Sequence, residues 1–155
     1  MKYRMLTEEE LEVLAEDLKH FLIVNGVHDE EWRAMNVSDV PKATRLVELF
    51  SDTVLKKVYE KIQYIEHRSE SSCLVFKLEK DKIELISLNR KPASKVELST
   101  PASIHAALVN TPEQLTLFKS EKQYTKTREL EIHEMVEQGC SNSTKEFWEL
   151  LCKTI

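Results

Sequence analysis

The chain has 155 residues, of which 41% are hydrophobic and 32% are charged, and its net charge is −5. This length predicts one domain over residues 1–155, and the hydrophobic content excludes an intrinsically disordered chain. The acidic balance makes nucleic acid an unlikely partner, because such binding depends on neutralising phosphates with Lys and Arg.

The three cysteines, Cys73, Cys140 and Cys152, lie far apart in the sequence. Their odd number and wide spacing favour reduced thiols over a disulfide framework or a metal site. The first residues, MKYRMLTEEE, turn acidic without an apolar segment, so no signal peptide is expected there. The longest apolar run, Phe21–Val24, is far shorter than the roughly 20 residues that cross a bilayer. The sequence therefore predicts a cytoplasmic protein without a membrane span.

The first predicted helix begins after Thr7, which is expected to form a capping box with Glu10. Apolar residues then recur with the helical period. Asn25-Gly26 follows this pattern, so we interpret it as a helix stop rather than as a hairpin turn. Asp29 is expected to cap a second, short helix that carries Trp32.

A long third helix is predicted over about residues 40–66, with Pro41 in its first turn. Its apolar stripe runs from Val47 to Ile65 with the helical period. Within it, Ser51-Asp52 marks the point where the helix is expected to break or bend.

Residues 72–79 and 82–88 alternate with the period of two that is typical of strands, and they predict a β-hairpin. Two strands alone are marginally stable, so the hairpin is expected to pack on helices or to pair with further strands. The predicted fold class is α+β, mostly helical, with one short antiparallel β-hairpin packed on helices.

After the hairpin, a further short strand is expected at Val96–Leu98. Thr100-Pro101 and Thr111-Pro112 are each expected to begin a short helix, since proline is favoured in the first turn. Two longer helices are predicted, one over about residues 122–138 and one after a capping box at Ser143–Glu146.

Residues 133–137, His-Glu-Met-Val-Glu, come close to the zinc-peptidase pattern H-E-x-x-H, but Glu137 replaces the second imidazole. We interpret the segment as a solvated acidic helix face. His28-Asp29 is interpreted as a helix N-terminus rather than a carboxylate–imidazole site. Cys73 has no neighbouring base and is expected to be a structural thiol. The sequence thus predicts no catalytic residue, no metal site and no cofactor.

The most basic stretch is Lys119–Arg128, with Tyr124 among its lysines. It could bind phosphate or an acidic partner. The favoured interpretation is a polar helix face whose lysines pair with Glu121 and Glu129 at helical spacing.

Short motifs are spread over nearly the whole chain. They are K-Y-R-x-L-T from Lys2, F-L-x-x-N-G-V with Trp32 after it, F-S-D from Phe50, and K-x-Y-x-K-x-R-E-x-E from Lys122. On these motifs the chain resembles a family of proteins of unknown function, of about this length, found in Bacteroidetes-type bacteria. The resemblance implies a free-standing bacterial cytoplasmic protein, and it brings no activity, cofactor or catalytic residue.

Five residues of these motifs are candidates for ligand binding: Arg4, Trp32, Asp52, Tyr124 and Arg128. In one hypothesis they form a pocket of a small-ligand-binding protein or enzyme, with Asp52 as acid and base and the arginines holding an anion. The ordinary alternatives are that Trp32 packs and Arg128 pairs with an acid.

The favoured hypothesis is a small interaction or assembly protein without catalytic activity, because the sequence has no recognised catalytic constellation. A hairpin over residues 72–88 would leave unpaired strand edges in a monomer. This favours a protein partner or self-association, with a homodimer through the 72–88 hairpin.

Overall fold

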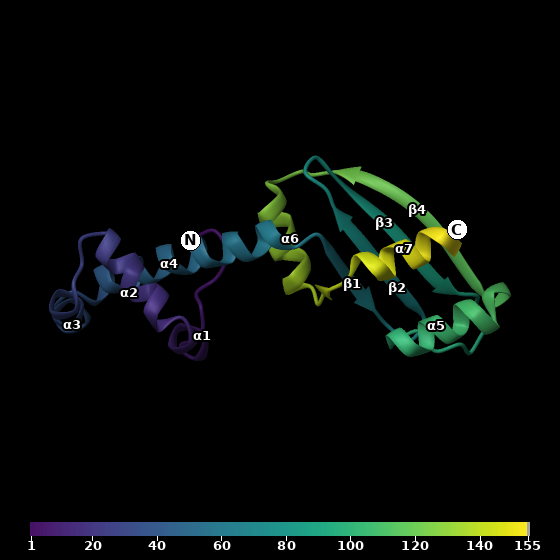
Figure 1. The fold of residues 1–155 in the computed structure, drawn as a ribbon, viewed down its shortest axis with the longest axis horizontal. Coiled ribbons are helices and arrows are strands. Elements are labelled where there is room, and N and C mark those ends of the chain that lie inside the picture. The colour runs from purple at the N-terminus through teal and green to yellow at the C-terminus, as the bar shows by residue number, and fades with distance from the viewer. Residues whose placement is uncertain (155) are drawn as a thin grey trace. The chain divides into compact units, whose positions relative to one another are not determined.

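The structure, a computed structural model, describes residues 1–154. The chain forms two compact units, Met1–Tyr59 and Glu60–Ile155, and each is described by itself. The single domain expected over residues 1–155 stays a prediction. Helices and an antiparallel sheet confirm the α+β class, but the sheet has five strands rather than one short hairpin (Figure 1).

The N-terminal unit, residues 1–59, is helical. Its helices are α1 (Glu8–Val13), α2 (Ala15–Val24), α3 (Asp29–Ser38) and α4 (Val40–Lys61), of which α4 runs on into the second unit. The expected capping box is confirmed: the Glu10 N–H donates to Thr7 Oγ1 at 3.2 Å, and the Thr7 N–H donates to Glu10 Oε1 at 2.9 Å. The first predicted helix is divided at Leu14, which lies between α1 and α2.

The expected helix stop at Asn25-Gly26 is confirmed. Gly26 has a φ of +79°, a left-handed conformation that glycine adopts without steric cost. The cap expected from Asp29 is wrong, because His28 occupies the N-cap position and Asp29 is the first helical residue of α3.

Helix α4 is shorter than predicted, and Ser51-Asp52 does not break it. The Ser51 hydroxyl instead accepts the Leu6 N–H at 3.1 Å, so it holds the segment before α1 against α4. The apolar core of this unit is small and consists of Leu6, Leu22, Val27, Ala43, Phe50, Leu55 and Tyr59.

The C-terminal unit is built on the sheet. Its elements are β1 (Tyr64–Arg68), β2 (Ser72–Leu78), β3 (Lys82–Arg90), α5 (Pro101–Asn110), η1 (Pro112–Gln114), β4 (Leu115–Gln123), α6 (Arg128–Glu137), β5 (Ser141–Asn142) and α7 (Lys145–Thr154). The strand order is β4-β3-β2-β1-β5, and every neighbouring pair is antiparallel.

The predicted hairpin is confirmed as β2 and β3, with Leu78 opposite Ile83 next to the turn. It is the interior of the sheet, because β2 also pairs with β1 and β3 also pairs with β4. Both outer edges of the 72–88 hairpin are therefore covered within the chain. Among residues 1–154 the outermost strands are β4 and β5 instead.

Four further predictions differ from the structure. Residues 122–123 end β4, so the helix expected from 122 begins only at Arg128. The segment after Pro112 is one 3-10 turn followed by β4, not a helix. Val96–Leu98 forms no strand. Thr144, not Ser143, caps α7, since its hydroxyl accepts the Phe147 N–H at 3.1 Å.

One face of the sheet is covered by helices. Helices α5 and α7 pack on one face (Figure 1), where Ile104 and Trp148 join Val75 and Ile86 in a buried cluster. Side chains of alternate residues point to the opposite face. Helix α6 begins at Arg128, whose guanidinium donates a hydrogen bond to the Leu78 carbonyl at the end of β2. It is followed by Gly139, next to the His67 ring.

Candidate binding groove

Helices α1, α2 and α3 form an open groove of about 570 Å³ in the N-terminal unit. Its apolar lining consists of Leu11, Ala15, Leu18, Leu22 and Trp32. Leu22 is buried, whereas Leu11, Leu18 and Trp32 are half-buried and Ala15 is exposed. The unit thus presents a strip of apolar side chains that its own helices cover only in part.

A row of carboxylates borders this apolar strip. Glu8, Glu12 and Glu16 line the groove at intervals of four residues and are all exposed. Glu8 and Glu12 lie four residues apart on α1, where like charges on one helix face repel each other, and Glu16 follows on α2. None of the three forms an ion pair within residues 1–154. The groove wall is therefore strongly negative.

The far end of the groove continues into a second hollow of about 390 Å³. Lys19 and Asp29 line both, and they form an exposed ion pair at 3.7 Å. His28, Glu30 and Glu31 also line the second hollow. The acidic side chains in the first turn of α3 interact favourably with the positive N-terminal end of its helix dipole, as expected. They also extend the negative surface of the groove.

Of the five predicted ligand-binding residues, Trp32 lines this groove. Arg4 and Asp52 also belong to the N-terminal unit, while Tyr124 and Arg128 belong to the C-terminal unit. The pocket predicted from all five residues stays a prediction. The structure does show what engages each of the other four within its own unit.

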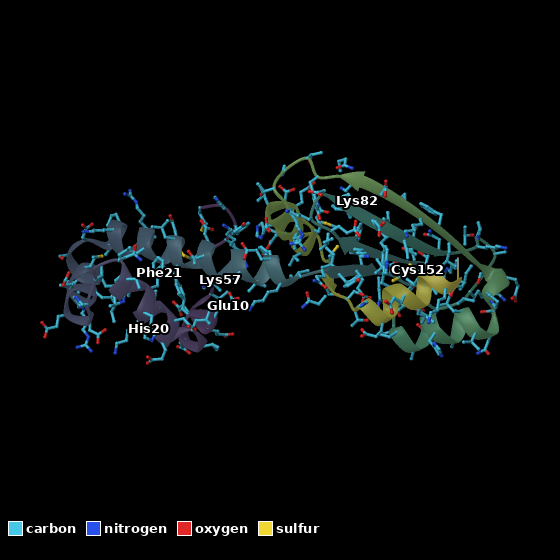
Figure 2. All side chains as sticks on the ribbon, turned by 45° about the horizontal axis from the view of Figure 1, so that its top comes forward. Glu10, His20, Phe21, Lys57, Lys82 and Cys152 are labelled. Carbon is cyan, nitrogen blue, oxygen red and sulfur yellow. The ribbon has the colours of Figure 1, made fainter. Side chains whose placement is uncertain are left out.

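Arg4 binds the carboxylate of Glu10, which is labelled in Figure 2. Two parallel hydrogen bonds join Nη1 and Nη2 to Oε1 and Oε2 at 2.8 and 3.0 Å, the bidentate geometry that gives Arg–carboxylate pairs their strength. This hydrogen-bonded guanidinium, helped by the Thr7 N–H, lowers the pKa of Glu10 to about 2. The pair fastens the N-terminal segment to the start of α1.

Asp52 accepts two backbone hydrogen bonds from the same segment. The Lys2 N–H donates to Oδ2 at 2.8 Å, and the Tyr3 N–H donates to Oδ1 at 3.1 Å. The Tyr3 ring packs edge-on against Tyr59 with centroids 5.3 Å apart. Both carboxylate oxygens of Asp52 are therefore engaged in holding residues 2 and 3 against α4.

Tyr124 and Arg128 bind the end of β2. The Tyr124 hydroxyl donates to the Glu79 carbonyl at 2.6 Å. Arg128 donates to the carbonyls of Leu78 and Ile62, with Nη2 3.1 Å from the former. Burial raises the pKa of Tyr124, against the opposite influence of the nearby Arg128 guanidinium. Both side chains hold backbone carbonyls at the start of α6.

A family model described as "Family of unknown function (DUF6495)" matches residues 1–155, the full length of the chain. The chain belongs to this family. Comparison with curated proteins and with solved structures found no match.

In this DUF6495 chain the acidic motif of α6 differs from its prediction. Glu131 and His133 are buried rather than solvated, and Thr125 Oγ1 donates to Glu131 Oε1 at 3.2 Å. Among residues 1–154, no three His, Cys, Asp or Glu side chains gather as metal ligands. No helix in that range is long and apolar enough to cross a membrane.

Cys73 is a buried thiol on the face of the sheet covered by α5 and α7. Burial, with the neighbouring carboxylate of Glu66, raises its pKa to about 11, against the opposite influence of Arg68. Glu66 and Arg68 form an ion pair with each other, and Arg68 lies over the Phe147 ring. A thiol in this state is a poor nucleophile, which agrees with the structural role expected of Cys73.

The prediction of a polar helix face at Lys119–Arg128 is wrong, because most of the segment is strand and turn. Within it, Glu121 pairs with Lys82 across the sheet at 2.9 Å. The interpretation of the sequence also missed the groove. Its signal was present as acids at residues 8, 12 and 16 beside an apolar stripe.

Proposed function

We propose that this protein is a non-catalytic interaction protein whose N-terminal groove binds a cationic, amphipathic helix of a protein partner. The observation that carries the proposal is the half-covered apolar strip beside Glu8, Glu12 and Glu16. An amphipathic helix places apolar side chains on one face and charges on its flank, so it matches both features of the groove.

The charge of the groove decides the chemistry of the partner. Glu8 and Glu12, four residues apart on α1, repel each other in the unbound protein, and Glu16 on α2 adds a third carboxylate to the same groove. Lys or Arg side chains of a partner would relieve that repulsion and form charge-assisted hydrogen bonds. An anionic ligand would add to it, so the groove does not suit the anion of the alternative hypothesis.

The alternative is a small-ligand-binding protein or enzyme built on Arg4, Asp52, Tyr124 and Arg128. Each of these side chains already binds groups of its own unit. In our proposal they are structural, and the ligand-binding role remains with Trp32.

We also propose that the protein is bacterial and is located in the cytoplasm. Cys73, Cys140 and Cys152 are all free thiols, which suits a reducing compartment. Fractionation of bacterial cells that express the protein would test the location, and recovery in a membrane or periplasmic fraction would contradict it.

Binding can be tested with a synthetic 14-residue helical peptide of Leu and Lys in amphipathic order, titrated by calorimetry. The control peptide has the same composition in scrambled order. We expect the amphipathic peptide to bind at least tenfold more tightly, because only it places leucines on one face. Equal affinity for the two peptides, or no binding, would contradict the proposal.

A matched pair of variants locates the binding site. Glu16 lines the groove, whereas its neighbour Asp17 on the same helix does not. Both Glu16→Lys and Asp17→Lys change the net charge equally, so long-range electrostatics affects them alike. We expect Glu16→Lys to weaken binding of the amphipathic peptide several-fold more than Asp17→Lys. Equal effects would show that only net charge matters.

A second candidate function is self-association, because the sheet has an open edge. The 72–88 hairpin cannot supply that edge without losing a pairing that the structure contains, with β1 or with β4. A homodimer would therefore use an outer strand. Sedimentation velocity over a range of protein concentrations measures whether a dimer forms.

A further inference from the structure

The outer edge of β4 carries backbone groups that point away from the sheet. Figure 1 shows β4 along one margin, and among residues 1–154 no strand pairs with its outer side. The Lys91 N–H donates to the Gln114 carbonyl at 2.8 Å, and hydrogen-bonded pairs alternate along an antiparallel ladder. Leu117, Lys119 and Glu121 therefore direct their N–H and C=O groups outward.

The side chains of this edge restrict how a further strand can add to it. Lys119 and Glu121 are both exposed and lie on the same face of β4, two residues apart. A second copy of β4 in antiparallel orientation can be placed in several registers, each of which puts outward-pointing residues opposite each other. Directly opposite side chains attract or repel according to their charges.

We propose that two copies of this chain form a dimer by antiparallel pairing of β4 with β4, with Lys119 of each copy opposite Glu121 of the other. The two-fold axis then passes between the two Ser120 residues. This inference deepens the second candidate function and does not depend on the groove of the N-terminal unit.

The neighbouring registers are disfavoured by charge. A shift of one residue in each strand toward the N-terminus places Lys119 opposite Lys119, and the same shift toward the C-terminus places Glu121 opposite Glu121. Only the proposed register gives two attractive pairs on this face. Charged residues on an edge strand normally prevent strand addition. Here Lys119 and Glu121 would allow the one register that places opposite charges next to each other, and they would oppose the registers that place like charges together.

The remaining contacts of the strand agree with this register. Phe118, which is 50% exposed, would lie opposite Lys122 of the other copy, whose apolar stem can cover the ring. Glu121 already pairs with Lys82, labelled in Figure 2, yet its side chain is 58% exposed and can accept a second cation. Lys119 Nζ lies 5.7 Å from the centroid of the Trp148 ring.

Charge reversal tests the register. Lys119→Glu or Glu121→Lys alone turns both attractive pairs into repulsive ones, so we expect the dimer dissociation constant from sedimentation velocity to rise on the order of tenfold or more. The double variant exchanges the two charges and restores both pairs, so its dissociation constant should return close to that of the unchanged protein. Circular dichroism confirms that each variant is folded.

A cysteine at residue 120 tests the axis. In the proposed dimer the two Ser120 residues form a pair without hydrogen bonds, with Cα atoms about 4.5 Å apart, a distance that a disulfide can bridge. Ser120→Cys should therefore oxidise rapidly to a covalent dimer, with the linked peptides identified by mass spectrometry. Thr116→Cys is the matched control, because Thr116 is also exposed on the same face of β4 but would not meet its own copy.

Three results would overturn the inference. The first is a protein that sediments as a monomer up to about 100 μM, a concentration at which weak specific association is detectable. The second is a double charge variant whose dimer dissociation constant is no lower than those of the single variants. The third is equal cross-linking at residues 116 and 120. None of them bears on peptide binding by the groove. Failure of this dimer is therefore distinguishable from failure of the proposed partner binding.

Discussion

The two units bury their apolar residues to very different extents. Of the hydrophobic residues described among residues 1–154, 21 are buried and ten large ones are exposed; residues 1–59 contribute seven of the former and eight of the latter. Val13, Val24 and Val37 are each 85% exposed. Among residues 60–154, the C-terminal unit exposes only Val109 and Phe118 from this class.

The difference reflects how helices and sheets cover each other. The central strands β2 and β3 are covered by α5 and α7 on one face, so Val75 and Ile86 lose all contact with water. Three short helices and α4 enclose a smaller core in the N-terminal unit. A contiguous exposed apolar patch commonly marks an interaction site, and in our proposal the partly covered strip of the groove is that patch.

The largest expected effect comes from a cavity in the sheet core. Ile86 is completely buried in β3, so Ile86→Ala should lower the free energy of unfolding of the C-terminal unit by about 2–5 kcal/mol. Each unit contains one tryptophan, Trp32 or Trp148. In a Trp32→Phe background, Trp148 fluorescence during urea unfolding reports on the sheet alone.

The matched variant in the helical unit is Leu22→Ala, since Leu22 is 4% exposed. Its neighbours can relax toward the open groove, so we expect the free energy of unfolding of the N-terminal unit to fall by about 2 kcal/mol, the lower end of the range for such substitutions. If Ile86→Ala shifted the unfolding of both units equally, the two would unfold as one and the comparison would fail.

An intermediate effect is expected at the start of α6. Arg128→Met removes the donors to the carbonyls of Leu78 and Ile62 while it keeps an apolar stem. These acceptors are partly buried, so leaving them without the Arg128 donors should cost about 1 kcal/mol, the lower end of the range for buried acceptors. Trp148 fluorescence during urea unfolding, again in the Trp32→Phe background, measures this loss.

Lys126→Met is its control, because Lys126 is exposed and forms a surface ion pair with Glu134. Such pairs contribute at most about 1 kcal/mol. Equal effects of the two variants would show that Arg128 acts by its charge and not by binding the two carbonyls.

Local chemistry was sufficient to predict the ends of several elements. The Thr7–Glu10 box, the Gly26 stop and the Thr100 cap in front of Pro101 each depend on residues within a few positions of one another. The β2–β3 hairpin was also predictable, since its alternation is visible in the sequence.

Strands β1 and β4 were missed because their pattern depends on the rest of the sheet. In β1, Glu66 and Arg68 occupy inward positions as an ion pair, so polar residues stand where alternation requires apolar ones. In β4 most side chains are exposed, and pairing with β3 fixes the strand rather than its own apolar pattern. Such long-range pairing overrides local propensity.

The candidate site shows the same limit. The motifs of the family resemblance marked Arg4, Asp52, Tyr124 and Arg128 for ligand binding. Arg4 instead binds the nearby Glu10, and the other three bind backbone groups 45 or more residues away in the sequence. Trp32 was correctly predicted to lie on the short helix after Gly26. Its groove partners on α1 and α2 became apparent only when the three helices were assembled.

The smallest expected effect is a pH dependence of stability that only the N-terminal unit should show. In the folded protein Arg4 holds the pKa of Glu10 near 2, against an ordinary value of 4.5. The Glu10 carboxylate therefore stabilises the N-terminal unit fully above pH 4.5, and this contribution is lost as the pH falls from 4.5 toward 2. Both side chains are 38% exposed, so solvent screening limits the contribution to about 1 kcal/mol.

Glu10→Gln should thus lower the urea midpoint of the N-terminal unit above pH 5, and the difference from the unchanged protein should shrink toward zero near pH 2. Trp32 fluorescence in a Trp148→Phe background follows this unit. Glu9→Gln is the control, because Glu9 lies beside Glu10 in the first turn of α1 but its exposed carboxylate does not bind Arg4. A difference that stays constant from pH 6 to pH 2 would show that the Arg4 pair has no part in it. The C-terminal unit lacks this pair, so substitution of Glu10 should leave its urea midpoint unchanged from pH 6 to pH 2.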